Sequence, residues 1–336
     1  MTSTAPTGAG TGTASGSELG RVLVLAGGLT YERDVSLKSG RRVVDALKNA
    51  AAEAILADAD AALLPLIADL DPAAVLIALH GGSGEDGAIR SILDSAGVPY
   101  VGTPAASCRL AFDKPTAKEL LRRAGIVTPD WVAIPHTTFR ELGAAAVLDA
   151  IVSRLGLPLM VKPAQGGSAL GATAVRSAGE LPAAMVSCFS YGETALVERF
   201  VEGVEIAVSV LDLDGAPQAL PAVEITAPDG IYDYAARYTA GETEFHVPAR
   251  VGADAAEAAR AVAITAHQVL GLRDLSRTDL IVDEAGAVHF LEVNVSPGLT
   301  ETSLLPIAAQ AAGLELGALY CDLVAAAIRR NRRERL

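Results

Sequence analysis

Two short apolar runs in the C-terminal part of the chain constrain the fold most. Residues 280–282 and 288–291 predict two β-strands, and the intervening Asp283-Glu284-Ala285-Gly286 is typical of a hairpin turn. Strands joined by so short a turn pair antiparallel, which brings the residues that flank them side by side. The pattern therefore predicts a hairpin that brings the polar residues flanking the two strands together at its open end.

Asp279, Glu292 and Asn294 flank these strands. Residues two positions apart in a strand point to the same face, so Glu292 and Asn294 project together, and Asp279 on the paired strand can join them. Three oxygen donors beside Arg277 suit a hard cation that carries phosphate oxygens, which means magnesium and a nucleotide. An ordinary hairpin with an acidic turn is the alternative.

The chain of 336 residues carries a net charge of −13, and half of its residues are apolar. Its length allows two or three folded domains, and its acidity argues against a general nucleic-acid binder, which needs a basic face. An acidic protein can bind ATP if a few placed cations meet the phosphates. Lysine is scarce while arginine is plentiful, so the lysines deserve notice: Lys38, Lys48, Lys114, Lys118 and Lys162.

Three widely spaced cysteines, Cys108, Cys188 and Cys321, form neither a metal-binding spacing nor a disulfide framework, which fits a reducing cytoplasm. Residues 1–20, rich in Thr, Ala, Gly and Ser, predict a flexible tail and not a signal peptide. Apolar runs elsewhere are too short or too interrupted to span a membrane. The basic stretch 329–335 predicts a solvated helix end.

The N-terminal part repeats a buried strand, a glycine-containing loop and a helix. Strands are predicted at 21–28, 75–80 and 98–101, and helices at 35–50 and 88–96. This repetition predicts an open parallel sheet that binds ligands at the carboxyl ends of its strands.

A glycine-rich segment, residues 164–171, separates the predicted strands 159–163 and 172–175. The segment is too short for a crossover helix, so we expect an antiparallel hairpin with a glycine-rich tip. It lacks the Gly-Lys-Ser/Thr ending of a Walker A loop. Its backbone amides can meet phosphate oxygens, with Lys162 just upstream as the cation. A plain flexible hairpin tip is the alternative.

The remaining periodicity predicts helices at 105–111, 115–124 and 255–270, a C-terminal helix from residue 316, and a strand at 131–134, with Asp113 capping the second helix. From residue 195 to the third of these helices the pattern is mostly strands.

Four segments together resemble the ATP-grasp superfamily and, within it, the D-alanine–D-alanine ligases. The resemblance runs from about residue 21 to residue 327. Its motifs occur in the family's order: Gly27-Gly28-Leu29-Thr30-Tyr31-Glu32-Arg33-Asp34-Val35-Ser36, His80-Gly81-Gly82-Ser83-Gly84-Glu85-Asp86-Gly87, Tyr232-Asp233-Tyr234-Ala235-Ala236-Arg237-Tyr238 and Leu291-Glu292-Val293-Asn294-Val295-Ser296-Pro297-Gly298-Leu299-Thr300.

The resemblance implies the residues that bind ATP and metal. Two lysines would hold the phosphates, a carboxylate and three backbone groups the adenine, one carboxylate the ribose, and three side chains two magnesium ions, with manganese as an alternative. In that order they are Lys114 and Lys162; Glu198 with Arg199, Phe200 and Val201; Glu205; and Asp279, Glu292 and Asn294.

The resemblance also implies the residues that bind two molecules of D-alanine. Glu32 would receive the first ammonium group with His80 nearby, Arg277 and the Gly298 amide would flank the activated carboxylate, and Ser303 and Leu304 would receive the second carboxylate. Ser168 and Tyr238 would join Glu32 in closing the site under a lid of residues 232–245. His80 is one candidate for taking the proton of the attacking amine, and a structural histidine at a strand end is the alternative.

Two residues depart from the family's pattern. Arg237 stands where the lid usually has lysine, which keeps the charge but changes the geometry of phosphate contact. Thr278 replaces an apolar residue and predicts a change of packing only. Tyr238 is present, as in relatives whose second substrate is an amine.

The resemblance implies an α/β and α+β protein of three lobes: an N-terminal Rossmann-like parallel-sheet domain (21–103), a central ATP-grasp subdomain (104–195) and a C-terminal ATP-grasp subdomain with the metal site and lid (196–330). The implied activity is the ATP-dependent joining of two D-alanines for peptidoglycan synthesis, in an enzyme whose relatives are commonly homodimers. A ligase of other substrate choice and a non-catalytic ATP-binding relative are the rivals.

Overall fold

Four parallel strands form the first sheet, in the order β2-β1-β3-β4. The computed structural model describes residues 15–213, 215–227 and 243–334. Strand β1 is buried over its whole length, as apolar strands covered on both faces are. The predicted open parallel sheet is therefore confirmed. Its elements are β1 (Val22–Ala26), α1 (Arg33–Asn49), β2 (Ala54–Asp58), α2 (Leu63–Leu70), β3 (Ala74–Ile77), α3 (Ala88–Ser95) and β4 (Tyr100–Val101).

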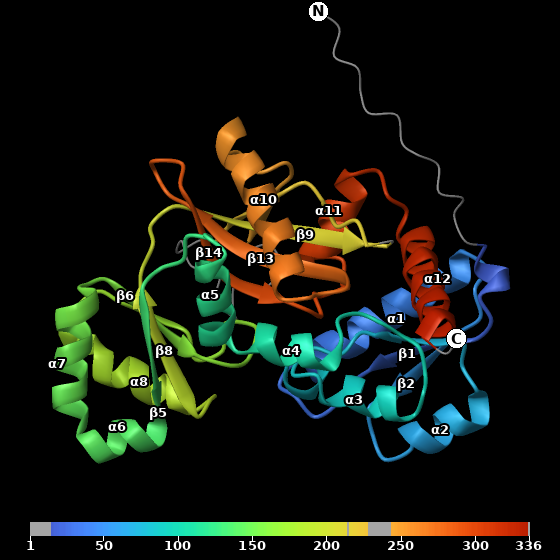
Figure 1. Cartoon of the computed structure of the whole chain (residues 1–336), viewed down its shortest axis with the longest axis horizontal. Helices are drawn as coiled ribbons and strands as arrows, with labels where there is room; N and C mark the ends of the chain where they lie inside the picture. The colour runs from blue at the N-terminus through green and yellow to red at the C-terminus, as the bar shows by residue number, and fades with distance from the viewer. Residues whose placement is uncertain (1–14, 214, 228–242, 335–336) are drawn as a thin grey trace, which may run out of the picture.

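The second sheet is antiparallel, in the order β5-β8-β6-β7, and has a hydrophobic core of its own with α7 and α8. Strands β6 and β7 form the predicted hairpin around the glycine-rich tip. This central lobe lies at one end of the molecule in Figure 1. Its elements are β5 (Trp131–Pro135), α6 (His136–Leu142), α7 (Ala144–Leu155), β6 (Leu159–Pro163), β7 (Thr173–Val175), α8 (Leu181–Phe189) and β8 (Thr194–Arg199).

The third sheet runs β12-β11-β9-β13-β14, with β10 paired to β9. The predicted hairpin is β13 and β14, which pair antiparallel and place Asp279 opposite Glu292 and Arg277 opposite Asn294. The helices α4 and α5 pack on β14 and share the core beneath α10. The elements are α4 (Ala105–Phe112), α5 (Lys114–Arg123), β9 (Val204–Asp212), β10 (Gln218–Ala219), β11 (Val223–Thr226), β12 (Glu244–His246), α10 (Ala253–Val269), β13 (Asp274–Val282) and β14 (Val288–Asn294).

The chain returns to the first sheet through α11 (Leu304–Ala311) and α12 (Leu316–Glu334). Helix α12 packs against α1, β3 and β4, and Figure 1 shows it beside the first sheet. Residues from the first and third sheets and from α12 share one hydrophobic core, whereas the central lobe has a separate one. Strand β8 straddles the predicted boundary at residues 195 and 196, so the division into lobes stays a prediction, with the central sheet closing at Arg199.

In the described ranges no single helix is long and apolar enough to span a membrane. The pair α11 and α12 meets that length and composition together, but it is bent by 106°. Short 3-10 helices complete the described elements at Gly16–Glu18, Gly82–Gly84 and Ala178–Glu180.

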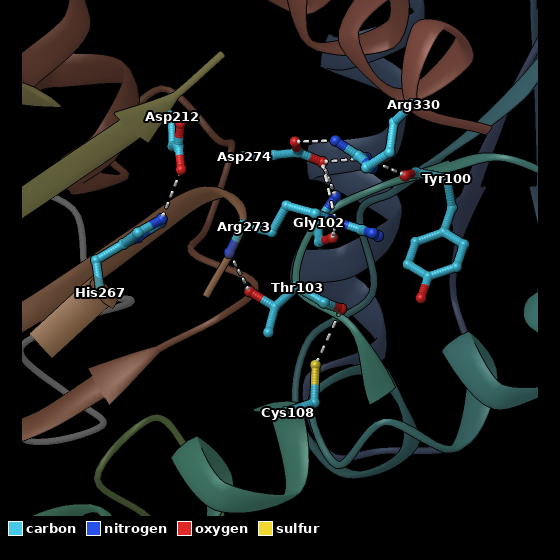
Figure 2. A network of polar contacts seen from close by, with 9 residues as sticks. All are labelled: Tyr100, Gly102, Thr103, Cys108, Asp212, His267, Arg273, Asp274 and Arg330. Atoms are coloured by element: carbon cyan, nitrogen blue, oxygen red, sulfur yellow. Dashed lines mark hydrogen bonds and ion pairs between the residues drawn. The ribbon is translucent and has the colours of Figure 1, made fainter. Parts of the chain in front are cut away.

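Asp274, at the start of β13, joins the first sheet to the third and to α12 (Figure 2). Its carboxylate accepts hydrogen bonds from the Gly102 N–H (2.7 Å) and from Arg330 (2.9 and 3.0 Å). Arg330 also donates to the Tyr100 carbonyl oxygen at 3.2 Å. The prediction of a solvated basic helix end is therefore wrong for Arg330, because its guanidinium binds the buried carboxylate of Asp274, which lies far away in the sequence.

Replacing Asp274 by Ala should destabilise the protein by about 3–5 kcal/mol, because the change leaves Arg330 and the Gly102 N–H without their buried partner. Thermal unfolding measures the effect. Arg332→Ala, at an exposed position of the same helix, is the control and should leave the midpoint unchanged. Equal midpoints of thermal unfolding for the two variants would contradict a stabilising role for the contacts of Asp274.

Candidate active site

Glu32 precedes α1 and is buried at the edge of the first sheet, where β1 ends in a glycine-rich loop. Asp58 fixes this loop, since it accepts a hydrogen bond from the Gly28 N–H (2.9 Å) and pairs with Arg33 (2.5 Å). Gly81 backs the carboxylate with a φ of +65°, and a Cβ there would clash with Glu32 Oε2. Only glycine therefore fits this position.

Ser168, in the glycine-rich tip of the central lobe, donates a hydrogen bond to Glu32 Oε1. The residues lie 136 positions apart in the sequence, and the structure brings them together as the resemblance implies. Ser168 has a φ of +53° and Ala169 a φ of +55°, so the tip adopts a conformation that side chains rarely favour. The backbone of the tip, held in this conformation, therefore forms one side of the site.

His80 is buried, and both of its ring nitrogens have partners. The Nδ1 atom lies 3.0 Å from the Ser296 carbonyl oxygen, so Nδ1 donates, and Nε2 then accepts from Ser39 Oγ at 2.9 Å. Burial lowers the pKa of His80, against the opposing charge of Glu32. The geometry makes His80 a neutral positioning residue. It favours a structural role for His80 over a role as acceptor of the amine proton.

A cavity of about 80 Å³ collects the residues expected to bind the amino acids. Helix α11 directs its N-terminus toward it, with Ser303 at the cap position and Leu304 as the first helical residue. Ser303 Oγ accepts a hydrogen bond from the Thr300 N–H at 3.0 Å. Free N–H groups at a helix start bind carboxylates. The cavity is lined by Glu32, His80, Glu85, Lys114, Ser168, Arg277, Asn294, Gly298, Ser303 and Leu304, among others.

A larger cavity of about 340 Å³ lies between the central and third sheets. Its volume is in the range of small-molecule sites. All of the residues expected at the adenine, ribose and phosphates that the structure describes line it: Lys114, Lys162, Glu198, Arg199, Phe200, Val201 and Glu205. The two cavities share Lys114, Gly166, Gly167 and Glu292, so a group transferred from one ligand to the other would pass there.

Glu198 is 2% exposed at the back of the larger cavity, where Lys162 and Lys118 each approach one of its oxygens at 2.7 Å. Burial alone would raise the pKa of Glu198, but the two lysines lower it overall. Burial lowers the pKa of Lys118 to about 8. One carboxylate between two lysines leaves a net positive charge beside the cavity, which suits a phosphate-bearing ligand.

Lys118 has no place among the site residues expected from the sequence. Its side chain is fully buried. It lies on the same face of α5 as Lys114, one helical turn further along. The scarcity of lysine in this chain was its one signal. Its partner Glu198 lies on β8, far along the sequence, so spacing could not reveal the pair.

The end of the β13–β14 hairpin gathers Arg277, Asp279, Glu292 and Asn294 as predicted. Arg277 binds both oxygens of Asp279, at 2.7 and 2.8 Å. Glu292 Oε2 lies 3.7 Å from Lys114 Nζ, and Lys114 Nζ also donates to the Gly166 carbonyl oxygen at 2.8 Å. Two carboxylates and an amide at the junction of the cavities fit a hard divalent cation.

Arg237, Tyr238 and most of the expected lid lie outside the described residues. Thr278 is buried in β13 between Val208 and Val293 on the neighbouring strands, so it contributes to packing, in accord with its expected role.

Residues 120–325 match the family described as "D-ala D-ala ligase C-terminus". The chain is 40% identical to the D-alanine–D-alanine ligase of Marinobacter nauticus, over 91% of this chain and 90% of that protein. It belongs to the D-alanine–D-alanine ligase family. The family member from Pseudomonas fluorescens is 38% identical, over 93% of this chain and 92% of its own.

Solved structures of the family share the fold. The D-alanine–D-alanine ligase of Bacillus anthracis, complexed with ATP, superposes with a TM-score of 0.77 at 27% identity, covering 94% of this chain and 99% of that one. The VanG D-Ala:D-Ser ligase of Enterococcus faecalis also gives 0.77 at 27% identity, covering 92% and 100%. The likeness therefore supports the three-lobed ATP-grasp fold, and fold alone does not choose the second amino acid.

Lys118→Met should raise the KM for ATP about tenfold, equivalent to about 1.4 kcal/mol, because Glu198 and Lys162 lose the cation that fixes them. Initial rates at varied ATP concentration measure this. Lys48→Met removes an exposed lysine and is the control. An unchanged KM in Lys118→Met would exclude Lys118 from the ATP site.

Proposed function

We propose that this member of the D-alanine–D-alanine ligase family joins two D-alanines with ATP, through an acyl phosphate, to supply peptidoglycan synthesis. The observation that carries the proposal is the junction of the two cavities at Lys114 and Glu292. A nucleotide-sized cavity on one side and an amino-acid cavity on the other suit transfer of a phosphoryl group to a carboxylate.

In the first step the carboxylate of the first D-alanine attacks the γ-phosphorus of ATP, and ADP leaves. Lys114 and Lys162 would hold the phosphates, and Glu32 the ammonium group. Asp279, Glu292 and Asn294 would hold magnesium, which when bound spreads the charge of the phosphoryl group. Glu32, Lys114 and Asp279 are buried, which limits the access of water that would otherwise hydrolyse the acyl phosphate.

In the second step the amine of the second D-alanine attacks the acyl carbon, and inorganic phosphate leaves. Arg277 and the Gly298 N–H are the donors proposed for the oxyanion, since both line the smaller cavity. Ser303 and the start of α11 would bind the second carboxylate. We also propose a cytoplasmic location, in line with three free buried cysteines, and assembly as a homodimer.

Phosphate release with ATP and magnesium tests the function, using D-alanine, L-alanine, D-serine and D-lactate singly and in pairs. Release with D-alanine alone, with the dipeptide identified by mass, is the expected result. Release only with D-alanine and D-serine together would favour the activity for which the VanG D-Ala:D-Ser ligase is named. Silence with every substrate would support the non-catalytic rival.

A further inference from the structure

The smaller cavity contains a second buried carboxylate, Glu85, besides Glu32. Glu85 is 6% exposed and lines the cavity from the loop that follows β3. Its Oε1 accepts a hydrogen bond from the Gly81 N–H at 2.9 Å. Among the described residues no cation forms an ion pair with it. A carboxylate buried in this way is unfavourable unless a ligand brings the missing positive charge.

The electrostatics of Glu85 place its proton equilibrium near neutrality. Burial and then the charge of Glu32 raise the pKa of Glu85 to about 7, against the Gly81 N–H, Lys114 and Arg277, which lower it. The titratable and charged groups that share the cavity are Glu32, His80, Lys114, Arg277 and Glu292. Glu85 can therefore both hold and release a proton at the pH of the cell.

The other candidates for proton transfer in the cavity are engaged. His80 uses both ring nitrogens, Glu32 accepts from Ser168, and Glu292 lies 3.7 Å from Lys114 Nζ. Two amino groups must enter this cavity if the proposed function holds. One remains an ammonium group, while the other must lose a proton before it can attack.

We propose that Glu85 binds the amino group of the second amino acid and accepts the proton that this group must lose. The assignment rests on the proposed function. The ammonium N–H bond breaks and its proton passes to the carboxylate of Glu85, which frees the nitrogen lone pair. That pair forms the C–N bond, the bond from the acyl carbon to the phosphate oxygen breaks, and the second amine proton leaves with inorganic phosphate.

Glu85→Gln separates a charge role from a structural one. Glutamine keeps the shape and an oxygen that accepts from the Gly81 N–H, but it cannot take a proton. Hydroxylamine supplies the second arm, since it is largely uncharged at neutral pH and attacks an acyl phosphate without prior deprotonation. The full-length parent and variant are each assayed with D-alanine and ATP, with and without hydroxylamine.

Dipeptide formation by Glu85→Gln should fall at least about 100-fold, the usual contribution of a general base, while D-alanyl hydroxamate formation stays close to the parent's. Asp86→Asn, one position on, is the matched control and should leave both products unchanged. A parallel fall of both products, or a fall of neither, would overturn the assignment. A parent that forms neither product from D-alanine would instead overturn the proposed function, and this assignment with it.

The pH dependence of the parent gives an independent readout, which does not require the variant to fold. Only ionised Glu85 can accept a proton, so the ratio of dipeptide to hydroxamate should fall as the pH drops through about 7. A ratio that stays constant from pH 6 to pH 8 (roughly one unit on either side of that pKa) would overturn the assignment.

Discussion

Glu292→Gln is expected to lower kcat about a thousandfold, which is about 4 kcal/mol of lost transition-state stabilisation. Glu292 stands opposite Asp279 on the hairpin, 3.7 Å from Lys114, at the junction of the two cavities. Glutamine has nearly the same shape, but it takes one negative charge from the proposed metal site. The change therefore acts on cation binding and on phosphoryl transfer, and it should leave the fold intact.

Steady-state rates over a magnesium titration measure this effect. The magnesium concentration needed for half-maximal rate should rise together with the fall in kcat, and the unfolding midpoint should not drop. Glu284→Gln makes the same change in the exposed turn of the same hairpin and is the control. Activity within tenfold of the parent's at every magnesium concentration would remove Glu292 from the metal set.

Arg277→Lys is the second large effect, with an expected fall of about 10²–10³ in kcat. Arg277 is buried and presents two nitrogen atoms to Asp279 while it lines the amino-acid cavity. Lysine keeps the positive charge, but it cannot hold Asp279 with a planar fork and also donate toward an oxyanion. The KM for ATP should change less than kcat, because Arg277 itself does not line the larger cavity and acts on it only through Asp279.

The matched control is Arg250→Lys, since Arg250 forms a similar two-nitrogen pair with Glu224 away from both cavities. That variant should keep the parent's kcat. Equal losses in the two variants would show that any arginine-to-lysine change harms the protein, and they would contradict a role for Arg277 in the reaction.

Local patterns predicted the elements that carry the site. The hairpin of β13 and β14 follows from two apolar runs around a four-residue turn, and its register then places Asp279 opposite Glu292. The first sheet follows likewise from its repeated strand, loop and helix. By contrast, β2 and α2 were not predicted, because both elements are short and α2 contains Pro65, which favours a loop over a helix in a sequence pattern.

Side-chain partners far apart in sequence could not be predicted from local patterns. Lys118 pairs with Glu198, and Arg330 with Asp274, only because separate elements pack together in the folded chain. His80 was left open between two roles until Ser39 and Ser296, the latter 216 residues away, were seen at its two nitrogens. Such roles depend on tertiary contacts, which no sequence spacing encodes.

The two ends of the chain segment that forms the central sheet lie side by side. Trp131, at the start of β5, stands opposite Glu198 near the end of β8, and the Arg199 N–H donates to the Asp130 carbonyl oxygen at 3.0 Å. The segment also has its own hydrophobic core, separate from the clusters formed by the rest of the chain. Residues 131–199 thus have the layout of an inserted cassette, which could be exchanged between relatives without rerouting the surrounding chain.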